Sequence, residues 1–499
     1  MRKILVANRG EIALRVMKAC REMGIPTVAV YSTSDKGSLH VQFADEAVCI
    51  GPPPPLESYL NIEKIISTAK QTGADAIHPG YGFLAENSDF ARRCAEESII
   101  FIGPNHEAMR LLGNKIESRK TIVKAGIPVI PGMMAGCAEV GSVVKEATQM
   151  GFPVLVKAAG GGGGKGMRIV RESKELEESL AACMREARSA FGDATIYLEK
   201  YIEKPRHVEF QILADTYGNV IHLFERECSI QRRYQKIVEE TPSVALDREL
   251  REKMGNVAVQ VAKTAGYTNA GTVEFLLDPT GKFYFLEVNA RVQVEHPITE
   301  AVVGVDLVKQ QIRIASGEKL TLKQEDLRQR GHAIECRIYA EDPENGFLPS
   351  AGKILFLKEP VGPGIRCDSG IWTGCEVSVH YDPILSKLVV WDETREQARR
   401  RMASALREYV ILGIKTTVHF LADIMEHPAF AEGKTHTGFI PEHFSDWKLT
   451  EGDPSETKIA LLAAAALGRS GPAVRAFATA REVFSPWKSN SRWRIAGIG

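Results

Sequence analysis

Residues 283–297 read FYFLEVNARVQVEHP, and from Glu287 onward polar side chains alternate with small apolar ones. Successive side chains of a β-strand point to opposite faces of the sheet. A strand over this segment therefore places Glu287, Asn289 and Arg291 on one surface. An amphipathic hairpin with a salt-bridged face is the alternative, but five alternating polar side chains in an otherwise apolar segment favour a functional surface.

A second carboxylate precedes this segment. Residues 271–278 read GTVEFLLD and carry Glu274 in a strand-like run, and DPTG at 278–281 predicts a hairpin turn. Pairing across that turn brings Glu274 near Glu287 and Asn289. Two carboxylates and an amide oxygen are hard ligands that suit Mg²⁺ bridging nucleotide phosphates. We therefore predict a metal site formed by Glu274, Glu287 and Asn289.

Five consecutive glycines at 160–164 follow the apolar run FPVLVK at 152–157 and lead into Lys165 and Gly166. Glycine accepts positive φ and lets backbone N–H groups approach a phosphate chain without a Cβ in the way. The run is not a P-loop, because no Gly-Lys-Ser/Thr follows it, and it is not the dinucleotide fingerprint. It predicts a phosphate-covering loop after a strand, and the alternative is a flexible linker.

Strand-like and helix-like segments alternate in the first hundred residues. The patterns predict strands over 3–7, 27–31, 74–78 and 99–102, and helices over 11–23, 62–72 and 87–97. Such alternation predicts a parallel sheet covered on both faces. Residues 8–10 follow the first strand, at the edge where open α/β sheets bind ligands.

Composition narrows the class of protein. The 499 residues suggest about three domains, and 63 basic and 63 acidic side chains give no electrostatic case for nucleic acid or a membrane surface. The longest apolar run, Ile459 to Leu467, is far shorter than a membrane span. The chain opens on a strand without a signal-peptide pattern, and nine cysteines without CxxC spacing indicate free thiols. We expect a cytoplasmic protein.

Together these motifs resemble biotin carboxylase, the ATP-grasp enzyme that carboxylates biotin. The resemblance spans roughly residues 1 to 440 and rests on the glycine run and on Ala7–Ala13, His78–Leu84, Pro205–Glu209, Glu287–Pro297 and Glu335–Ile338. It implies an α/β and α+β fold. The implied parts are an N-terminal parallel-sheet domain (1–113), an ATP-grasp domain (114–329) with a lid at about 131–203, a C-terminal α+β domain (330–445), and an extension (446–499) that we interpret as a docking surface for partner subunits.

The resemblance also implies a nucleotide site. Two lysines that look like surface residues on their own match the ATP-grasp lysines that reach the phosphates, and Glu199 matches the acceptor for the adenine amino group. The implied ATP-binding residues are Lys115, Lys157, Gly163, Gly164, Glu199, Lys200, Tyr201, Ile202, His207, Gln231, Tyr234, Glu274 and Glu287.

Two of these positions need comment. His207 matches a histidine near the ribose and phosphates, although without the resemblance a half-buried strand residue is the favoured interpretation. Tyr234 stands where related sequences commonly have histidine, so that nucleotide contact does not carry over unchanged. The surrounding basic segment 227–236, taken alone, predicts a basic surface patch, and a nucleic-acid contact with one aromatic is the lesser alternative.

The remaining chemistry concerns bicarbonate and biotin. Glu295 is the expected base that lets bicarbonate attack the γ-phosphate of MgATP to form carboxyphosphate, and Arg291 offers a planar fork for the anion. By resemblance, Lys236 and the backbone N–H groups of Gln293 and Val294 complete the bicarbonate site. Arg337 matches the arginine that stabilises the biotin anion. Its alternative is a core arginine paired to Glu335.

We therefore expect a ligase that uses ATP with Mg²⁺ or Mn²⁺ to carboxylate biotin. No Met-Lys-Met motif is present, so biotin is expected on a separate carrier protein, with a carboxyltransferase subunit choosing the final acceptor. A homodimer or larger complex is expected. The alternatives are another ATP-grasp ligase that forms an acyl-phosphate, which needs neither the 291–295 segment nor Arg337, and a catalytically silent nucleotide-binding subunit.

Overall fold

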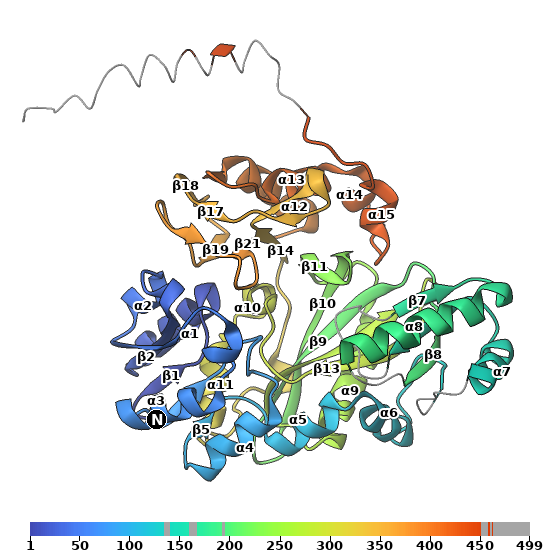
Figure 1. Cartoon of the computed structure of the whole chain (residues 1–499), viewed down its shortest axis with the longest axis horizontal. Helices are drawn as coiled ribbons and strands as arrows, with labels where there is room; N and C mark the ends of the chain where they lie inside the picture. Colours follow the sequence, from blue (N-terminus) through green and yellow to red (C-terminus); the bar gives the residue numbers. More distant parts are fainter. Residues whose placement is uncertain (134–139, 159–166, 192–194, 451–457, 460–461, 463–499) are drawn as a thin grey trace, which may run out of the picture. The chain divides into compact units, whose positions relative to one another are not determined.

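The computed structural model describes residues 1–133, 140–158, 167–191, 195–450, 458–459 and 462. The chain divides into two compact units, Met1–Trp447 and Lys448–Gly499. All elements named below belong to the first unit. Within it the blue N-terminal part and the green central part lie side by side, and the orange C-terminal part covers both (Figure 1).

The N-terminal part is a five-stranded parallel sheet, as predicted. Its order is β3 (Glu46–Gly51), β2 (Thr27–Ser32), β1 (Ile4–Val6), β4 (Ala76–His78) and β5 (Ile100–Phe101). In β1, Ile4 and Val6 pack in the same core cluster as Ile12 of α1 (Gly10–Glu22), whereas Leu5 packs with Ile65 of α3 (Ile62–Thr72). Alternate side chains of one buried strand thus enter two cores, and helices cover both faces.

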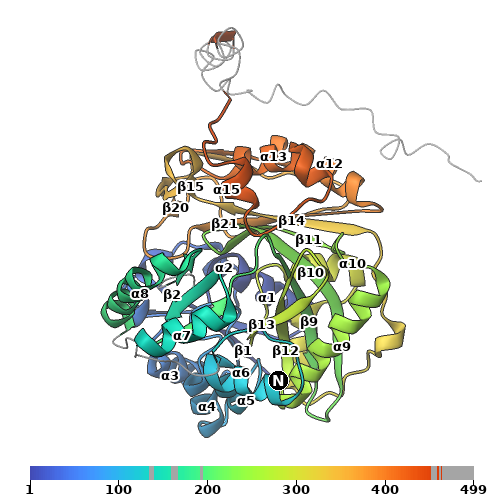
Figure 2. The ribbon, with the colours of Figure 1, turned by 90° about the vertical axis from the view of Figure 1, so that its right-hand side faces the viewer.

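The central feature is an antiparallel sheet of eight strands. Its order is β13 (Phe283–Asn289), β12 (Asn269–Leu277), β9 (Arg206–Ala214), β10 (Val220–Arg232), β11 (Gln235–Thr241), β14 (His332–Tyr339), β21 (Ile384–Asp392) and β19 (Ile365–Ser369). Figure 2 shows the green strands β9 to β11 running into β14 and β21 of the C-terminal part. The two regions therefore share one hydrogen-bonded sheet.

The two faces of this sheet differ in chemistry. On β9, Val208 and Phe210 pack on Met254 and Ala258 of helix α9 (Arg248–Thr264). The residues that alternate with them along the strand, His207, Glu209 and Gln211, are polar and also buried. Since strand side chains alternate, one face of the sheet forms the core and the other presents buried polar groups.

A separate three-stranded sheet forms the lid region. Its order is β7 (Met167–Val170), β6 (Val154–Ala158) and β8 (Ile196–Lys200), and helices α7 (Val140–Met150) and α8 (Leu176–Phe191) pack on it. Strand β6 confirms the strand predicted before the glycine run. Residues 159–166, including Gly163 and Gly164, lie outside the described residues.

The C-terminal part packs helices α12 (Arg395–Glu408) and α13 (Val418–Glu426) on β14 and β21. Three two-stranded sheets join β15 (Glu341–Asp342) to β16 (Leu348–Pro349), β17 (Gly352–Lys353) to β20 (Glu376–Val377), and β18 (Phe356–Lys358) to β22 (Val410–Leu412). The other helices are α1 (Gly10–Glu22), α2 (Leu39–Phe43), α3 (Ile62–Thr72), α4 (Ser88–Glu96), α5 (His106–Gly113), α6 (Lys115–Lys124), α10 (His296–Val303), α11 (Leu307–Ala315), α14 (Pro428–Ala431) and α15 (Phe439–His443).

Among the described ranges, no helix combines the length and apolar character needed to cross a membrane. Two features of the fold differ from the sequence prediction. The alternation after Glu287 predicts a strand that continues through Arg291, but β13 ends at Asn289 and a loop follows before α10. The second difference is that the sequence does not predict α2, which has only five residues, or β3, whose short apolar run does not alternate and is partly exposed.

Candidate active site

Lys236 on β11 is the centre of a buried cluster of charges. Its Nζ lies 2.5 Å from Glu209 Oε2, 2.8 Å from Glu274 Oε1 and 2.8 Å from Glu295 Oε1. Burial alone lowers the pKa of a lysine, but these three carboxylates outweigh it and raise the pKa of Lys236 well above its usual value. A permanently charged ammonium group therefore stands among three carboxylates.

The predicted hairpin is confirmed. In the β12–β13 pairing Glu274 lies opposite Glu287 and Thr272 opposite Asn289. Asn289 Nδ2 donates to Glu274 Oε1 at 2.8 Å, and His207 Nε2 lies 3.2 Å from Glu274 Oε2. Burial opposes ionisation of Glu274, but Lys236 and His207 lower the pKa of that carboxyl well below its usual value.

This arrangement fits a divalent cation. The Glu274 carboxylate is ionised, the Glu287 side chain on the opposite strand is exposed, and Asn289 adds an amide oxygen. Hard oxygen donors of this kind suit Mg²⁺. A neighbouring set, His207, Glu209 and Glu274, also offers ligand atoms within 4.8 Å of one another.

The loop between β13 and α10 carries the predicted bicarbonate residues. Arg291 Nε pairs with Glu86 at 3.0 Å, and its Nη2 donates to Asn289 Oδ1 at 2.8 Å. Gln293 is buried and uses both ends of its amide, because Nε2 donates to Glu274 and Oε1 accepts from Arg226. The Gln293 side chain is therefore committed to protein partners.

Glu295 bridges the loop and the C-terminal part. Glu295 is the residue before α10, and its side chain does not cap that helix. The carboxylate instead faces the Lys236 cluster. Oε1 accepts from Lys236, and Oε2 accepts from Arg337 Nη2 at 2.9 Å. Burial raises the pKa of a carboxyl, but Lys236, Arg337 and Arg226 together lower that of Glu295 well below its usual value.

Arg337 on β14 pairs with Glu239 at 2.6 Å as well as with Glu295. The alternative of a core arginine paired to Glu335 is wrong: both Glu335 carboxylate oxygens are buried without a hydrogen-bond partner among the described residues. Burial and the neighbouring Glu239 and Glu295 charges raise the pKa of Glu335 well above its usual value, against the pull of Lys387 and Arg337.

The predicted nucleotide residues are brought together only in part. Lys157 Nζ contacts Glu199 Oε2, and Arg119 Nη1 reaches Oε1 of the same carboxylate at 2.9 Å. Lys200 donates to the backbone carbonyls of Gly151 and Phe152, so its ammonium is already engaged. Tyr201 and Ile202 follow directly after β8.

The other predicted nucleotide residues lie in different segments of the chain. Gln231 Nε2 donates to the Cys228 carbonyl at 2.7 Å. Tyr234 lies in the β10–β11 turn with φ of 68° and is 56% exposed. Lys115 begins α6, and its side chain is outside the described residues, as are Gly163 and Gly164.

Sequence reasoning assigned no role to several residues of this site: Glu86, Glu209, Arg226, Glu239 and Lys387. Arg226 is fully buried and donates to Glu209, Gln211, Thr272, Gln293 and Thr299. Glu209 follows His207 by two residues, so strand alternation alone would have placed both on one face. The other three join the site through contacts between distant segments, for which the local pattern gives no signal.

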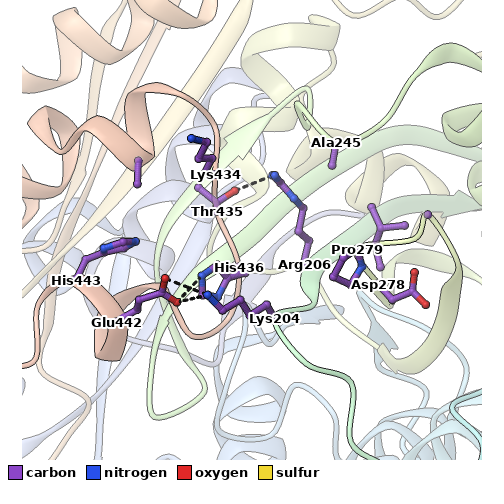
Figure 3. A pocket seen from close by; sticks show the side chains of 13 residues that line it. Lys204, Arg206, Ala245, Asp278, Pro279, Lys434, Thr435, His436, Glu442 and His443 are labelled. Atoms are coloured by element: carbon purple, nitrogen blue, oxygen red, sulfur yellow. Dashed lines mark hydrogen bonds and ion pairs between the residues drawn. The ribbon is translucent and has the colours of Figure 1, made fainter.

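A cavity of about 570 Å³ lies at the start of β9, beside Arg206, the 278–281 turn and residues 429–443. Figure 3 shows Lys204 and His436 beside Glu442, and Arg206 directed at Thr435. Arg206 also pairs with buried Glu227 at 3.0 Å. Because these cations already have acidic partners, the cavity does not present a free cationic surface.

Comparison with known proteins matches three family models. The first is described as the biotin carboxylase N-terminal domain (residues 1–109), the second as the ATP binding domain of the carbamoyl-phosphate synthase L chain (114–323), and the third as the biotin carboxylase C-terminal domain (335–442).

Curated relatives agree. The chain is 55% identical to a biotin carboxylase of Nostoc sp. over 440 residues, which are 88% of this chain and 98% of that one. It is 54% identical to one of the subunits of pyruvate carboxylase from Methanothermobacter thermautotrophicus, over 88% and 90% of the two chains. It is 49% identical to the alpha subunit of methylcrotonoyl-CoA carboxylase of Dictyostelium discoideum, over 99% and 70%.

Solved structures agree as well. The dimer of the biotin carboxylase domain of Hydrogenobacter thermophilus 2-oxoglutarate carboxylase, in complex with MgADP, ADP and bicarbonate, matches with a TM-score of 0.87 and 50% identity over 90% of this chain and 99% of that one. A nucleotide complex of Campylobacter jejuni biotin carboxylase matches with a TM-score of 0.86 and 47% identity, over 89% and 99%.

Proposed function

Because this chain belongs to the biotin carboxylase family, we propose that its Lys236 cluster is the place where ATP and bicarbonate react and that Arg337 faces biotin. The enzyme is a ligase that carboxylates biotin with ATP and bicarbonate. The observation that carries the residue assignment is the position of Glu295, whose two carboxylate oxygens contact Lys236 and Arg337.

The first step needs a base beside bicarbonate. With a strongly lowered pKa, Glu295 is ionised but a weak base while two cations hold it. Bicarbonate is itself an anion, so its binding beside Lys236 and Arg291 withdraws part of that positive charge from Glu295 and raises the pKa of the carboxyl. Glu295 then takes the bicarbonate proton as the bicarbonate oxygen attacks the γ-phosphate, which releases ADP and forms carboxyphosphate.

The oxygen donors of Glu274, Glu287 and Asn289 would hold Mg²⁺, or Mn²⁺, which prefers similar ligands. The metal supplies positive charge to the phosphates in phosphoryl transfer. Lys157 on β6 and Glu199 on β8 of the separate lid sheet contact each other through their side chains. We assign them to the phosphates and the adenine, with Lys115, Gly163 and Gly164 completing the nucleotide site.

The second step concerns biotin. Carboxyphosphate releases CO₂, and the phosphate set free takes the proton from the biotin ureido nitrogen. The resulting anion attacks CO₂ through that nitrogen, which gives carboxybiotin and inorganic phosphate. Arg337 is 7% exposed and held by Glu239 and Glu295, so its guanidinium is fixed before the anion forms. A pre-placed cation of this kind stabilises developing negative charge without reorganisation.

The names of the relatives, several of which are subunits of larger carboxylases, support a proposal about partners. We propose that biotin arrives on a carrier protein that these 499 residues do not contain, and that a carboxyltransferase uses the product in a dimeric or larger complex. The match to the Dictyostelium protein covers 494 residues, against 440 for the Nostoc enzyme, which supports a docking role for 446–499 in an acyl-CoA carboxylase. We place the complex in the cytoplasm.

Phosphate release by the purified chain tests this function. We expect slow MgATP hydrolysis that requires bicarbonate and accelerates when free biotin is added. Biotin methyl ester and desthiobiotin serve as matched additives, because the latter lacks the thioether ring but keeps the ureido group. Normal ATP binding without any stimulation by biotin or by a biotinylated carrier would contradict the assignment.

A further inference from the structure

Two buried side chains hold the backbone carbonyls of the bicarbonate loop. The imidazole Nδ1 of His296 lies 2.7 Å from the Gln293 carbonyl oxygen. The ammonium group of Lys387, on β21, donates to the Val294 carbonyl at 3.0 Å. Both His296 and Lys387 have no exposed surface, and neither has a role in the reaction as described above.

These contacts fix the direction of the peptide N–H groups. A trans peptide is planar, so its N–H points opposite to its C=O. The Gln293 carbonyl turns toward His296, and therefore the Val294 N–H turns away from it. Within the described part of the chain, the Val294 N–H donates to no protein acceptor. A backbone donor held in this way suits an anion.

The protonation state of His296 supports this role. A carbonyl oxygen only accepts, so Nδ1 must carry the proton of a neutral imidazole. Burial, with the nearby charges of Lys387, Arg15 and Arg366, lowers the pKa of His296 well below its usual value. Its Nε2 is buried without a hydrogen-bond partner among the described residues. The ring therefore serves as a neutral donor to one carbonyl.

Lys387 connects the loop to the other two parts of the fold. Its Nζ lies 3.1 Å from Glu11 Oε2 on α1 and 3.9 Å from Asp368 Oδ2 on β19. One ammonium group thus joins the N-terminal helix, the bicarbonate loop and the C-terminal strands. Through Lys387, the Val294–Glu295 peptide and the start of α10 are therefore tied to the N-terminal helix and to the C-terminal strands.

We propose that His296 and Lys387 are positioning residues for bicarbonate. His296 orients the Val294 N–H, and Lys387 orients the next peptide and the Glu295 side chain that follows. This inference rests on the proposed function, because it takes the 293–295 loop as the place where the anion binds.

The test compares His296→Asn with His296→Leu. These replacements have nearly the same shape and remove the same ring, but only asparagine keeps a side-chain donor near the Gln293 carbonyl. We expect the bicarbonate KM, from bicarbonate-dependent phosphate release, to rise roughly five- to tenfold in His296→Leu and much less in His296→Asn. The KM for ATP is expected to stay within about twofold, since the lost hydrogen bond of about 1 kcal/mol lies in the bicarbonate loop and involves none of the residues assigned to the nucleotide.

His40→Leu is the matched control. His40 is a fully buried histidine whose Nε2 lies 3.3 Å from the Val30 carbonyl, far along the chain from the loop. A purely structural role predicts that His40→Leu and His296→Leu lower the melting temperature and change both KM values alike. His296→Phe, which keeps a ring without a donor, replaces His296→Leu where folding needs the ring volume.

The outcomes separate the two proposals. A bicarbonate KM that rises in the donor-less variants and is rescued in His296→Asn supports the inference. Equal bicarbonate KM values in wild type and in the donor-less variants would overturn it and leave the proposed function intact. A wild-type enzyme whose ATP hydrolysis ignores bicarbonate would overturn both.

Discussion

Arg337 donates a hydrogen bond from Nη2 to Glu295 Oε2 at 2.9 Å. This contact joins the residue assigned to biotin with the residue assigned to bicarbonate. The same carboxylate receives Lys236 on its other oxygen. The two half-reactions therefore share one charged group, and changes on the biotin side are expected to reach the bicarbonate side.

Glu295→Gln keeps the size of the side chain and removes the base. We expect bicarbonate-dependent phosphate release and fixation of labelled bicarbonate to fall together, by about 10²–10⁴. Glu225→Gln is the control, since Glu225 is also fully buried and paired to an arginine, Arg251, outside the cluster. A Glu295→Gln enzyme that loses only biotin carboxylation would contradict the role of Glu295 as the base.

Arg337→Ala withdraws the charge that faces the biotin anion. We expect biotin carboxylation to fall by about 10²–10³. Bicarbonate-dependent ATP cleavage should fall by a smaller factor, because Glu295 loses one of its two contacts but keeps Lys236. Both rates are measured on this variant and on Arg395→Ala, in which an arginine paired to Glu240 is removed. Equal losses of the two activities with an intact fold would show that Arg337 is not specific to biotin.

Glu274→Gln and Glu287→Gln each remove an anionic ligand of the metal. We expect turnover to be lost in both, with the rise in melting temperature on adding MgADP also lost. Asp278→Asn changes a carboxylate at the tip of the same hairpin and should keep both properties. Retained turnover in either glutamine variant would contradict the assignment of Glu274 and Glu287 to the metal.

His222 gives a pH dependence of folding. Burial lowers the pKa of His222 to about 4, whereas the unfolded value is about 6.5. Between these values the unfolded chain binds the extra proton, so stability falls as the pH drops from 6.5 toward 4 and is regained above 6.5.

The variant for this test is His222→Asn. In the wild type the Phe224 N–H donates to His222 Nδ1, and the asparagine side chain keeps an acceptor for that N–H. From pH 7 to pH 5 we expect the free energy of unfolding of the wild type to drop by about 2 kcal/mol more than that of the variant. Denaturant unfolding at the two pH values measures both. Parallel pH curves would mean that His222 titrates alike in the folded and unfolded chain.

The sequence predicted those parts of the site that depend on local pattern. The hairpin of Glu274 and Glu287 was predicted because two alternating runs flank a DPTG turn. The same alternation wrongly extends β13 past Asn289, because the loop after the strand also has alternating polar and apolar residues. In that loop the two residue types do not separate onto an exposed and a buried face, since Val292 and Gln293 are both buried. Helix α10 then begins, with Pro297 in its first turn. Period two is thus necessary for a strand but does not define where it ends.

Contacts between residues that are far apart in the sequence could not be predicted from local patterns. Arg337 meets Glu239 across 98 residues, Arg291 meets Glu86 across 205, and Lys387 meets the Val294 carbonyl across 93. Each partner looks like an ordinary charged residue in its own segment. The pairing of β11 with β14 brings Arg337 to Glu239, whereas the other two contacts join the loop before α10 to the N-terminal part and to β21.

The continuous eight-stranded sheet limits how this enzyme can vary in length. Lys236 and Arg337 belong to neighbouring strands whose ladder pairs Val238 with Cys336 and Glu239 with Glu335. Inserting or deleting one residue inside either strand turns every later side chain to the opposite face. A length change inside β11 or β14 is therefore expected to separate Lys236 from Arg337, whereas a substitution there keeps the register of the two strands.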